Sequence, residues 1–285
     1  NFPAALSGRT HALGRIFDVM GGLLGQGAPE AMNAAGFSDS PHLFYSGYDE
    51  KGEWFQLFQI GFGGIPGRPV GDGPDGHSLW PGFTNVPNEF IEAYFPLRVE
   101  QYETITDSGG AGKHRGGNGL SVAYRFLNDG NIAIHDERWL TYPWGVNGGT
   151  PGQRSTKILK RADGTQQILP AKCDGVEVKT GDLLYFNTWG GGGWGDPFLR
   201  DCDSVLDDVN RGLVSIEGAI RYGVVIVDGA VEEQQTTALR AALSEKRGAT
   251  QLFDFGGTIE EIKARCLEET GLPAPQTPSF VKSRA

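Results

Sequence analysis

The sequence predicts an α+β fold, in which a β-rich body with long glycine-rich loops is flanked by an N-terminal helix and by C-terminal helices. Apolar residues recur with a helical period near the N-terminus, with a period of two from about residue 42 to 190, and with a helical period again after Pro197. Glycine contributes 44 of the 285 residues, and its longest motifs lie in the middle of the chain. We therefore expect three regions: a helical segment over 1–41, a β-rich body over 42–199, and a helical region with an irregular tail over 200–285.

The first helix is predicted between Arg9 and Gln26, where apolar residues follow the i, i+3, i+4, i+7 spacing of one helical face. These residues are Leu13, Ile16, Phe17, Met20, Leu23 and Leu24. Glycines at four positions of the same stretch each weaken helix formation by about 1 kcal/mol relative to alanine. The helix therefore requires tertiary packing, and its glycines would admit a close neighbour.

The β-rich body is predicted from alternating apolar residues bounded by turn signals. Strands are expected at 54–60, 120–126, 132–134 and 183–188, and a hairpin over 155–169 turns at Asp163-Gly164.

The last region changes back to helical spacing. A short amphipathic helix is expected around 205–213, a second one capped by Ser215 runs to Tyr222, and a short strand over 224–227 precedes a turn. Helices follow at 236–247 and 258–270, and Thr258 with Glu261 fits a capping box.

Composition limits the classes of partner. The chain has 25 Lys and Arg against 35 Asp and Glu, a net charge of −10, and no basic stripe. This balance argues against nucleic acid and anionic membranes, which require clustered cations. No apolar run approaches the ~20 residues of a membrane helix, and no signal peptide is visible. Three widely spaced cysteines fit a reducing cytoplasm. Because the chain opens without methionine, we expect a processed, trimmed or partial product.

Three glycine motifs dominate the middle of the sequence, at residues 108–119, 143–149 and 189–197. Glycine is concentrated where the backbone turns with positive φ or approaches something closely, so these motifs indicate a built site or interface. They lack the Gly-Lys-Ser/Thr ending of a phosphate loop and the G-x-G-x-x-G pattern of a dinucleotide site. Tight structural turns are therefore the favoured interpretation over nucleotide binding.

Candidate site residues fall in four places. The acidic loop 71–77, which contains Asp75 and His77, fails the calcium-loop pattern but is a candidate site lining. Asn85, Glu89 and Arg98 form a polar cluster, for which structural hydrogen bonding competes with a catalytic or subunit-contact role.

The other two places each contain a histidine and an arginine close together in the sequence. His114 and Arg115 lie within a glycine loop, and Arg138 ends a His-Asp-Glu-Arg run at a strand end. Histidine suits proton transfer near neutral pH. The five histidines show no metal-ligand spacing, so no metal ligand is predicted in this chain. No G-x-S-x-G motif supports serine-hydrolase chemistry.

These residues together resemble the carboxy-terminal half of the hydantoinase B/oxoprolinase family. The matching segments keep their order over most of the chain. They are Asn1-Phe2-Pro3-Ala4-Ala5, Asp72-Gly73-Pro74-Asp75-Gly76-His77, Asn85-Val86-Pro87, Pro96-Leu97-Arg98-Val99, Ser108-Gly109-Gly110-Ala111-Gly112, Arg115-Gly116-Gly117, Glu137-Arg138, Pro143-Trp144-Gly145, the run 190–197 and Tyr222-Gly223-Val224-Val225.

The resemblance implies a B-type subunit that works with an A-type subunit carrying ATP and Mg²⁺ on an actin-like fold. The partner phosphorylates a carbonyl-derived oxygen, and water then opens the activated cyclic amide. A divalent metal such as Zn or Mn is implied in the amino-terminal half, which we expect on a companion upstream polypeptide. No cofactor is expected on this chain alone.

The resemblance and the residues together give the predicted site. The catalytic set is His77, His114, Arg115 and Arg138, and the substrate-binding set is Asp75, Asn85, Glu89 and Arg98. Arginines and histidines of this set would hold an anionic phosphorylated intermediate or a substrate carboxylate.

The substrate is left open between hydantoin, 5-oxoproline and a lactam. Two alternatives stand beside the cyclic-amide hydrolase: part of an ATP-dependent ketone carboxylase of the acetone or acetophenone type, and a non-catalytic scaffold that orders the subunit interface.

Overall fold

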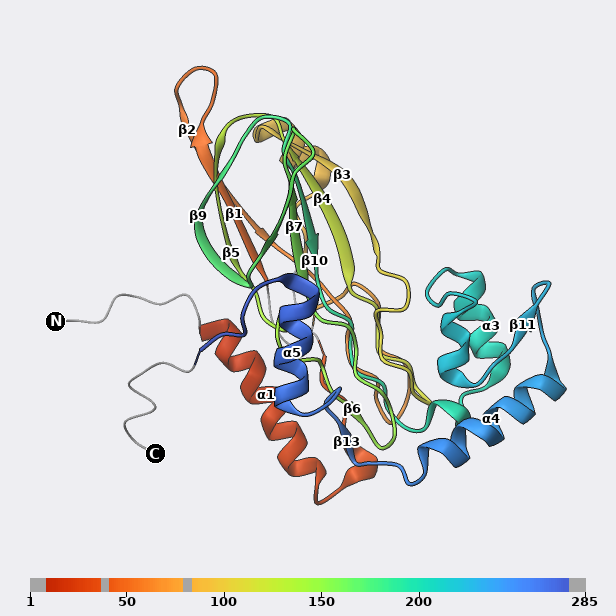
Figure 1. The fold of residues 1–285 in the computed structure, drawn as a ribbon. Coiled ribbons are helices and arrows are strands. Elements are labelled where there is room, and N and C mark those ends of the chain that lie inside the picture. Colours follow the sequence, from red (N-terminus) through yellow and green to blue (C-terminus); the bar gives the residue numbers. More distant parts are fainter. Residues whose placement is uncertain (1–8, 37–40, 79–83, 277–285) are drawn as a thin grey trace, which may run out of the picture.

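Two antiparallel sheets form the body of the protein, as the computed structural model shows for residues 9–36, 41–78 and 84–276 (Figure 1). The first sheet has the strand order β2-β1-β5-β9 and the second has the order β3-β4-β10-β7-β8. The strands of the first sheet are β1 (His42–Tyr48), β2 (Trp54–Ile60), β5 (Gly130–His135) and β9 (Lys172–Val178). Those of the second are β3 (Leu97–Thr104), β4 (Leu120–Phe126), β7 (Thr156–Lys160), β8 (Gln166–Leu169) and β10 (Leu183–Asn187).

One hydrophobic core lies between these sheets, because alternate residues of each strand point to the same face. Leu43 and Tyr45 of β1 pack there with Ile132 and Ile134 of β5, and Phe126 of β4 is fully buried. The predicted strands and the hairpin are confirmed, and so is the α+β class. Among the strands of the two sheets, the sequence missed β1, β3, whose alternation is interrupted by a bulge between Val99 and Gln101, and β9, which is polar.

The sandwich also encloses an ion pair. Lys157 and Asp136 are both fully buried, and the Lys157 ammonium lies 2.5 Å from the Asp136 carboxylate. Burial lowers the pKa of Lys157, and the charge of Asp136 opposes that shift. The aspartate of the His-Asp-Glu-Arg run thus pairs inside the core.

Helices lie near both ends of the described chain, and a short one, which the sequence did not predict, lies between β2 and β3. They are α1 (Arg9–Gly25), α2 (Asn88–Tyr94), α3 (Cys202–Asn210), α4 (Glu233–Arg247) and α5 (Ile259–Thr270), with 3₁₀ turns η1 (Pro29–Ala31), η2 (Pro197–Leu199) and η3 (Gly218–Tyr222). Short strand pairs join β11 (Ile226–Val227) to β12 (Ala230–Val231), and β6 (Gly145–Val146) to β13 (Phe253–Asp254). The capping box of Thr258 and Glu261 is confirmed, and Ser215 accepts a hydrogen bond from the Gly218 N–H. No helix among the described residues is long and apolar enough to cross a membrane.

Below the sheets in Figure 1, long segments run side by side and form what we call the glycine bundle, made of residues 34–36, 63–67, 108–119, 144–152 and 189–195. The run 190–193 exchanges backbone hydrogen bonds with each of the other segments. Gly191 illustrates this: its N–H donates to the Gly117 carbonyl at 2.8 Å, and its carbonyl accepts from the Gly110 N–H at 2.8 Å. The bundle is therefore held together by main chain.

Close packing, not turn geometry, explains this glycine run. A Cβ atom added at Gly190 would lie 1.9 Å from the Ser108 carbonyl oxygen, and one at Gly192 would lie 2.1 Å from the Trp144 carbonyl oxygen. None of residues 190–193 has positive φ. The prediction of tight turns is thus wrong for this run, because the side-chain space is filled by neighbouring backbone, much as glycine is required at the axis of collagen.

We predict that Gly190→Ala lowers the free energy of unfolding by at least about 3 kcal/mol, since the new methyl group can be accommodated only if the segments separate. Gly71→Ala is the matched control, because no atom lies within 4 Å of a Cβ at Gly71. Chemical denaturation followed by circular dichroism measures both. Equal stability of the two variants would contradict the packing account.

Candidate functional site

Three of the eight predicted site residues come together at one edge of the glycine bundle, where the loop 71–77 is fixed against residues 113–119. The Gly73 N–H donates to the Arg115 carbonyl at 2.8 Å, and the Gly76 N–H donates to the Asn118 carbonyl at 2.9 Å. The Asn118 N–H in turn donates to the Asp75 carboxylate at 2.7 Å. These bonds bring Asp75, His114 and Arg115 into one site.

Arg115 is buried at this site, and its guanidinium group forms ion pairs with carboxylates. Its two terminal nitrogens lie 2.7 and 3.2 Å from the Asp75 carboxylate oxygens, and Nε lies 3.4 Å from an Asp208 oxygen. Burial by itself would lower the pKa of Arg115, but Asp75 and Asp208 outweigh it and raise the pKa above the ordinary value. The guanidinium is therefore permanently charged and already paired.

Arg200 extends this arrangement. It donates two 2.7 Å hydrogen bonds to the two Asp72 oxygens and a third, also 2.7 Å, to Asp208. The order Asp75, Arg115, Asp208, Arg200, Asp72 thus alternates in charge, and we call it the carboxylate–arginine chain. Burial opposes ionisation of Asp72, but the hydrogen bonds and charge of Arg200 hold its pKa below the usual value.

His114 lies at the partly exposed rim of this chain. Its Nδ1 is 3.9 Å from the Asp72 carboxylate, and its ring centroid is 5.6 Å from that of Trp194. Burial lowers the pKa of His114, Asp72 opposes the shift, and the charges of Lys113 and Arg200 add to it. The imidazole is therefore mainly neutral at pH 7, the form that accepts a proton.

Arg138 lies in a second place, between α1 and the bundle. One terminal nitrogen is 2.5 Å from the Asp18 carboxylate, the other donates to the Tyr142 carbonyl at 2.9 Å, and the guanidinium lies 5.0 Å from the Trp144 ring centroid. Burial and the charge of Arg15 lower the pKa of Arg138 to about 10, against the opposing effect of Asp18. Its backbone has φ 54°, uncommon for a residue other than glycine.

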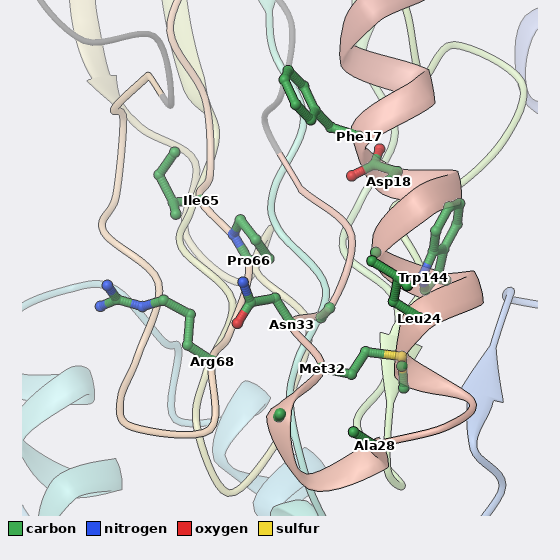
Figure 2. Close-up of a pocket in the computed structure, with 14 residues that line it drawn as sticks. Phe17, Asp18, Leu24, Ala28, Met32, Asn33, Ile65, Pro66, Arg68 and Trp144 are labelled. Carbon is green, nitrogen blue, oxygen red and sulfur yellow. The ribbon is translucent and has the colours of Figure 1, made fainter.

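A cavity of about 570 Å³ lies beside Asp18 and Trp144 (Figure 2). α1 forms one wall, and the segments 31–34 and 65–68 form the other. Its lining is mostly apolar, with Asp18, Asn33 and Arg68 as the polar members. This shape and lining suit an apolar group with few polar contacts.

The remaining predicted residues do not join either place. Asn85 donates to the Tyr102 hydroxyl, which fits the structural alternative, and Glu89 and Arg98 are exposed on α2 and β3. These elements lie at the end of the sheets away from the glycine bundle in Figure 1. His77 is exposed, and its backbone pairs with that of Gly63.

Sequence reasoning missed the residues that complete the carboxylate–arginine chain: Asp72, Arg200 and Asp208. Asp208 carried a usable signal, because it lies three residues after Val205 and so shares the apolar face of α3. A carboxylate at such a position requires a buried cation. Arg200 carried no signal, because it is 128 residues from its partner Asp72.

The described residues do not fit a metal or a nucleotide. Within 9–36, 41–78 and 84–276, no group of three His, Cys, Asp or Glu side chains is placed to hold a metal ion. The carboxylates that do gather at the site are paired with Arg115 and Arg200. The N–H groups of Gly191, Gly192 and Gly193 donate to backbone carbonyls, so they do not form a phosphate cradle.

A sequence model of the family described as hydantoinase B/oxoprolinase matches residues 1–197. The putative B-type subunit of the D-/L-hydantoinase of Pseudomonas sp. strain NS671 is 29% identical over 84% of this chain and 41% of its own. The acetone carboxylase alpha subunit of Xanthobacter autotrophicus strain Py2 is 26% identical over 78% of this chain and 34% of its own. The crystal structure of the ATP-dependent caprolactamase from Pseudomonas jessenii matches with a TM-score of 0.63 and 26% identity, over 76% of this chain and 40% of that one. The chain thus spans well under half the length of these relatives.

We predict that Arg200→Ala lowers the free energy of unfolding by about 3–5 kcal/mol, because it leaves the buried Asp208 carboxylate without this partner. Arg211→Ala, which removes an exposed arginine, is the control and should change stability by less than about 0.5 kcal/mol. Urea unfolding at pH 7 measures both.

The pH dependence supplies a second measurement. Because the folded-state pKa of Asp72 is depressed, its contribution to stability is present above about pH 4 and disappears as the pH falls through the folded-state value. Asp72→Asn should therefore flatten this part of the stability profile. An unchanged profile would show that the Asp72–Arg200 pair contributes nothing.

Proposed function

Because the chain belongs to the hydantoinase B/oxoprolinase family, we propose that it forms part of the B-type subunit of an enzyme that opens cyclic amides with the help of ATP. The observation that carries this proposal is the family match over residues 1–197 together with its relatives. One relative is named for hydantoin and another for caprolactam, and both of these compounds are cyclic amides. The name of the caprolactamase also states its dependence on ATP.

The proposed chemistry follows from the weakness of amides as electrophiles. An A-type partner, with Mg²⁺, transfers the γ-phosphoryl group of ATP to the amide oxygen, and water then adds to the activated carbon. The C–N bond breaks, and the ring nitrogen takes a proton and leaves as the amine. A second water hydrolyses the resulting acyl phosphate to a carboxylate and phosphate. The implied divalent metal belongs, in this proposal, to the upstream half of the B-type subunit. We place the assembly in the cytoplasm, where three free cysteines remain reduced.

Within this chain, we propose His114 as the residue that exchanges a proton with the reacting groups. It is the partly exposed, neutral member of the predicted catalytic set, and Asp72 lies beside it. Arg115 is proposed as a positioning residue, because its guanidinium is occupied by Asp75 and Asp208 and holds the loop 71–77 beside His114. The substrate-binding roles of Asn85, Glu89, Arg98 and the catalytic roles of His77 and Arg138 stay predictions.

The test of the reaction is a coupled assay of the complete assembly that measures ATP hydrolysis and product together. We expect a hydantoin, 5-oxoproline or a lactam to stimulate ATP hydrolysis and to be opened in step with it. Product formation from acetone or acetophenone that requires bicarbonate would instead support the carboxylase alternative, which the likeness to the acetone carboxylase alpha subunit favours. ATP hydrolysis that neither the cyclic amides nor the ketones stimulate would count against both reactions.

We predict that His114→Asn lowers kcat by about 10²-fold or more, the usual contribution of a positioned acid or base. His135→Asn is the matched control, because His135 is also partly exposed beside an aspartate, Asp174, with Nε2 3.1 Å from its carboxylate. It should leave kcat unchanged.

The pH–rate profile distinguishes a catalytic from a structural role of His114. Because the pKa of His114 is lowered, the imidazole becomes protonated only below its ordinary pKa of about 6.5. We therefore expect kcat/KM to fall only below about pH 6.5. This acid limb should be absent from the profile of His114→Asn. Wild-type kinetics of His114→Asn would support the scaffold alternative.

A further inference from the structure

The helix α1 packs against the protein with the opposite side from the one its sequence predicts. Its apolar residues face outward, with exposed fractions from 49% at Met20 to 71% at Leu24. The outward set is Ile16, Phe17, Val19, Met20, Leu23 and Leu24. The residues of the inward side are His11, Gly14, Arg15, Asp18, Gly22 and Gly25. A helix that hides its polar side and exposes its apolar side is incomplete as a surface element.

Specific contacts fix this orientation. Asp18 pairs with Arg15 at 2.8 Å and with the buried Arg138 at 2.5 Å. A Cβ atom at Gly25 would lie 2.2 Å from the Met32 sulfur, so the helix approaches this segment at a distance that only glycine allows. Rotating α1 to bury its apolar side would separate the Asp18–Arg138 pair and place large side chains against Met32.

The exposed side continues into a depression. Phe17 and Leu24 also line the cavity of about 570 Å³ between α1 and residues 65–68 (Figure 2). Gly21 lies between them in the sequence, and nothing lies within 4 Å of a Cβ at that position. The surface therefore offers a ridge of apolar side chains beside a hollow that would accept a bulky apolar group.

The chemistry of this surface selects a protein partner over a membrane. Helices that lie on anionic membranes carry Lys and Arg on an exposed polar side. The charged residues within α1 whose side chains the structure describes, Arg15 and Asp18, face inward. Each large apolar side chain left in water forgoes roughly 1.5–3 kcal/mol of burial.

We propose that the outward face of α1 and the adjoining cavity dock the upstream part of the B-type subunit, through an uncharged apolar surface. The lengths of the relatives support this occupant, because the matched region accounts for 41% of the hydantoinase relative and 40% of the caprolactamase chain. More than half of each of these relatives therefore lies outside the matched region and is long enough to supply a partner for this face. This inference rests on the proposed function only in placing the chain in such an assembly.

The test uses the assembly itself. The chain is co-expressed with the other polypeptides of its own assembly, and an affinity tag on the upstream polypeptide of the B-type subunit recovers the complex. Leu24→Glu places a charge on the outward face, and Leu199→Glu is the matched control, because Leu199 is 68% exposed on η2. We expect Leu199→Glu to be recovered like the wild type and Leu24→Glu to be recovered at least tenfold less.

Two further measurements keep the outcome independent of folding defects. Thermal unfolding of the purified wild-type chain and of each variant should give the same Tm. If the Tm of Leu24→Glu differs from that of the wild type, Met20→Glu replaces it as the test variant. Hydrogen exchange of wild-type residues 16–24 should be at least tenfold slower in the complex than in the chain alone.

The proposal is overturned if Leu24→Glu and Met20→Glu assemble like the wild type, or if exchange in α1 is the same with and without the partners. It is also overturned if the chain alone forms a dimer that Leu24→Glu dissociates, because the occupant is then a second copy. A complex that depends on Leu24 but does not couple ATP to ring opening would refute the proposed function and support the docking surface.

Discussion

Close contact between backbone segments is the constraint on which the rest of the structure depends. In the glycine bundle, the run 190–193 bonds to the four other segments, and neighbouring carbonyls occupy the space of its side chains. Such packing has few adjustable parts, because main-chain atoms cannot change rotamer as side chains do. The bundle therefore acts as a rigid base. It fixes the loop 71–77, the segment of His114 and the segment of Trp144 relative to one another.

The carboxylate–arginine chain adds a second level to that base. Its three aspartates and two arginines come from the loop 71–77, the bundle, and the region around α3. Each guanidinium satisfies two carboxylates, so removal of either arginine leaves a buried charge. A network of this kind specifies one arrangement of three distant segments. It also leaves His114, at its rim, as the titratable group that remains available to a ligand.

The sequence predicted elements where a local signal existed and failed where the cause was tertiary. The alternation of 120–126 and the capping box at Thr258 are local, and both are confirmed. The glycine motifs are visible in the sequence, but their geometry depends on which segments meet, and no pattern within one segment contains that information. The same holds for Arg200, whose partner lies in a distant loop. The contacts of Arg138 with α1 and Trp144 likewise join distant segments, and its catalytic role stays a prediction.

The attachment of α1 shows how the fold uses charge to leave an apolar surface available. An amphipathic helix usually docks through its apolar side, and the position of α1 along and around its axis would then be set by loosely directional contacts. Here the Asp18–Arg138 pair and the contact of Gly25 with Met32 set that position instead. A buried ion pair adds little net stability, because both charges lose their hydration. Its directional hydrogen bonds instead fix the orientation of the helix. The helix is thereby held in one register on the glycine bundle, with Leu23 and Leu24 exposed. A partner that covers this face would bury apolar side chains that stay exposed to water when this chain folds alone, and that burial would stabilise the complex.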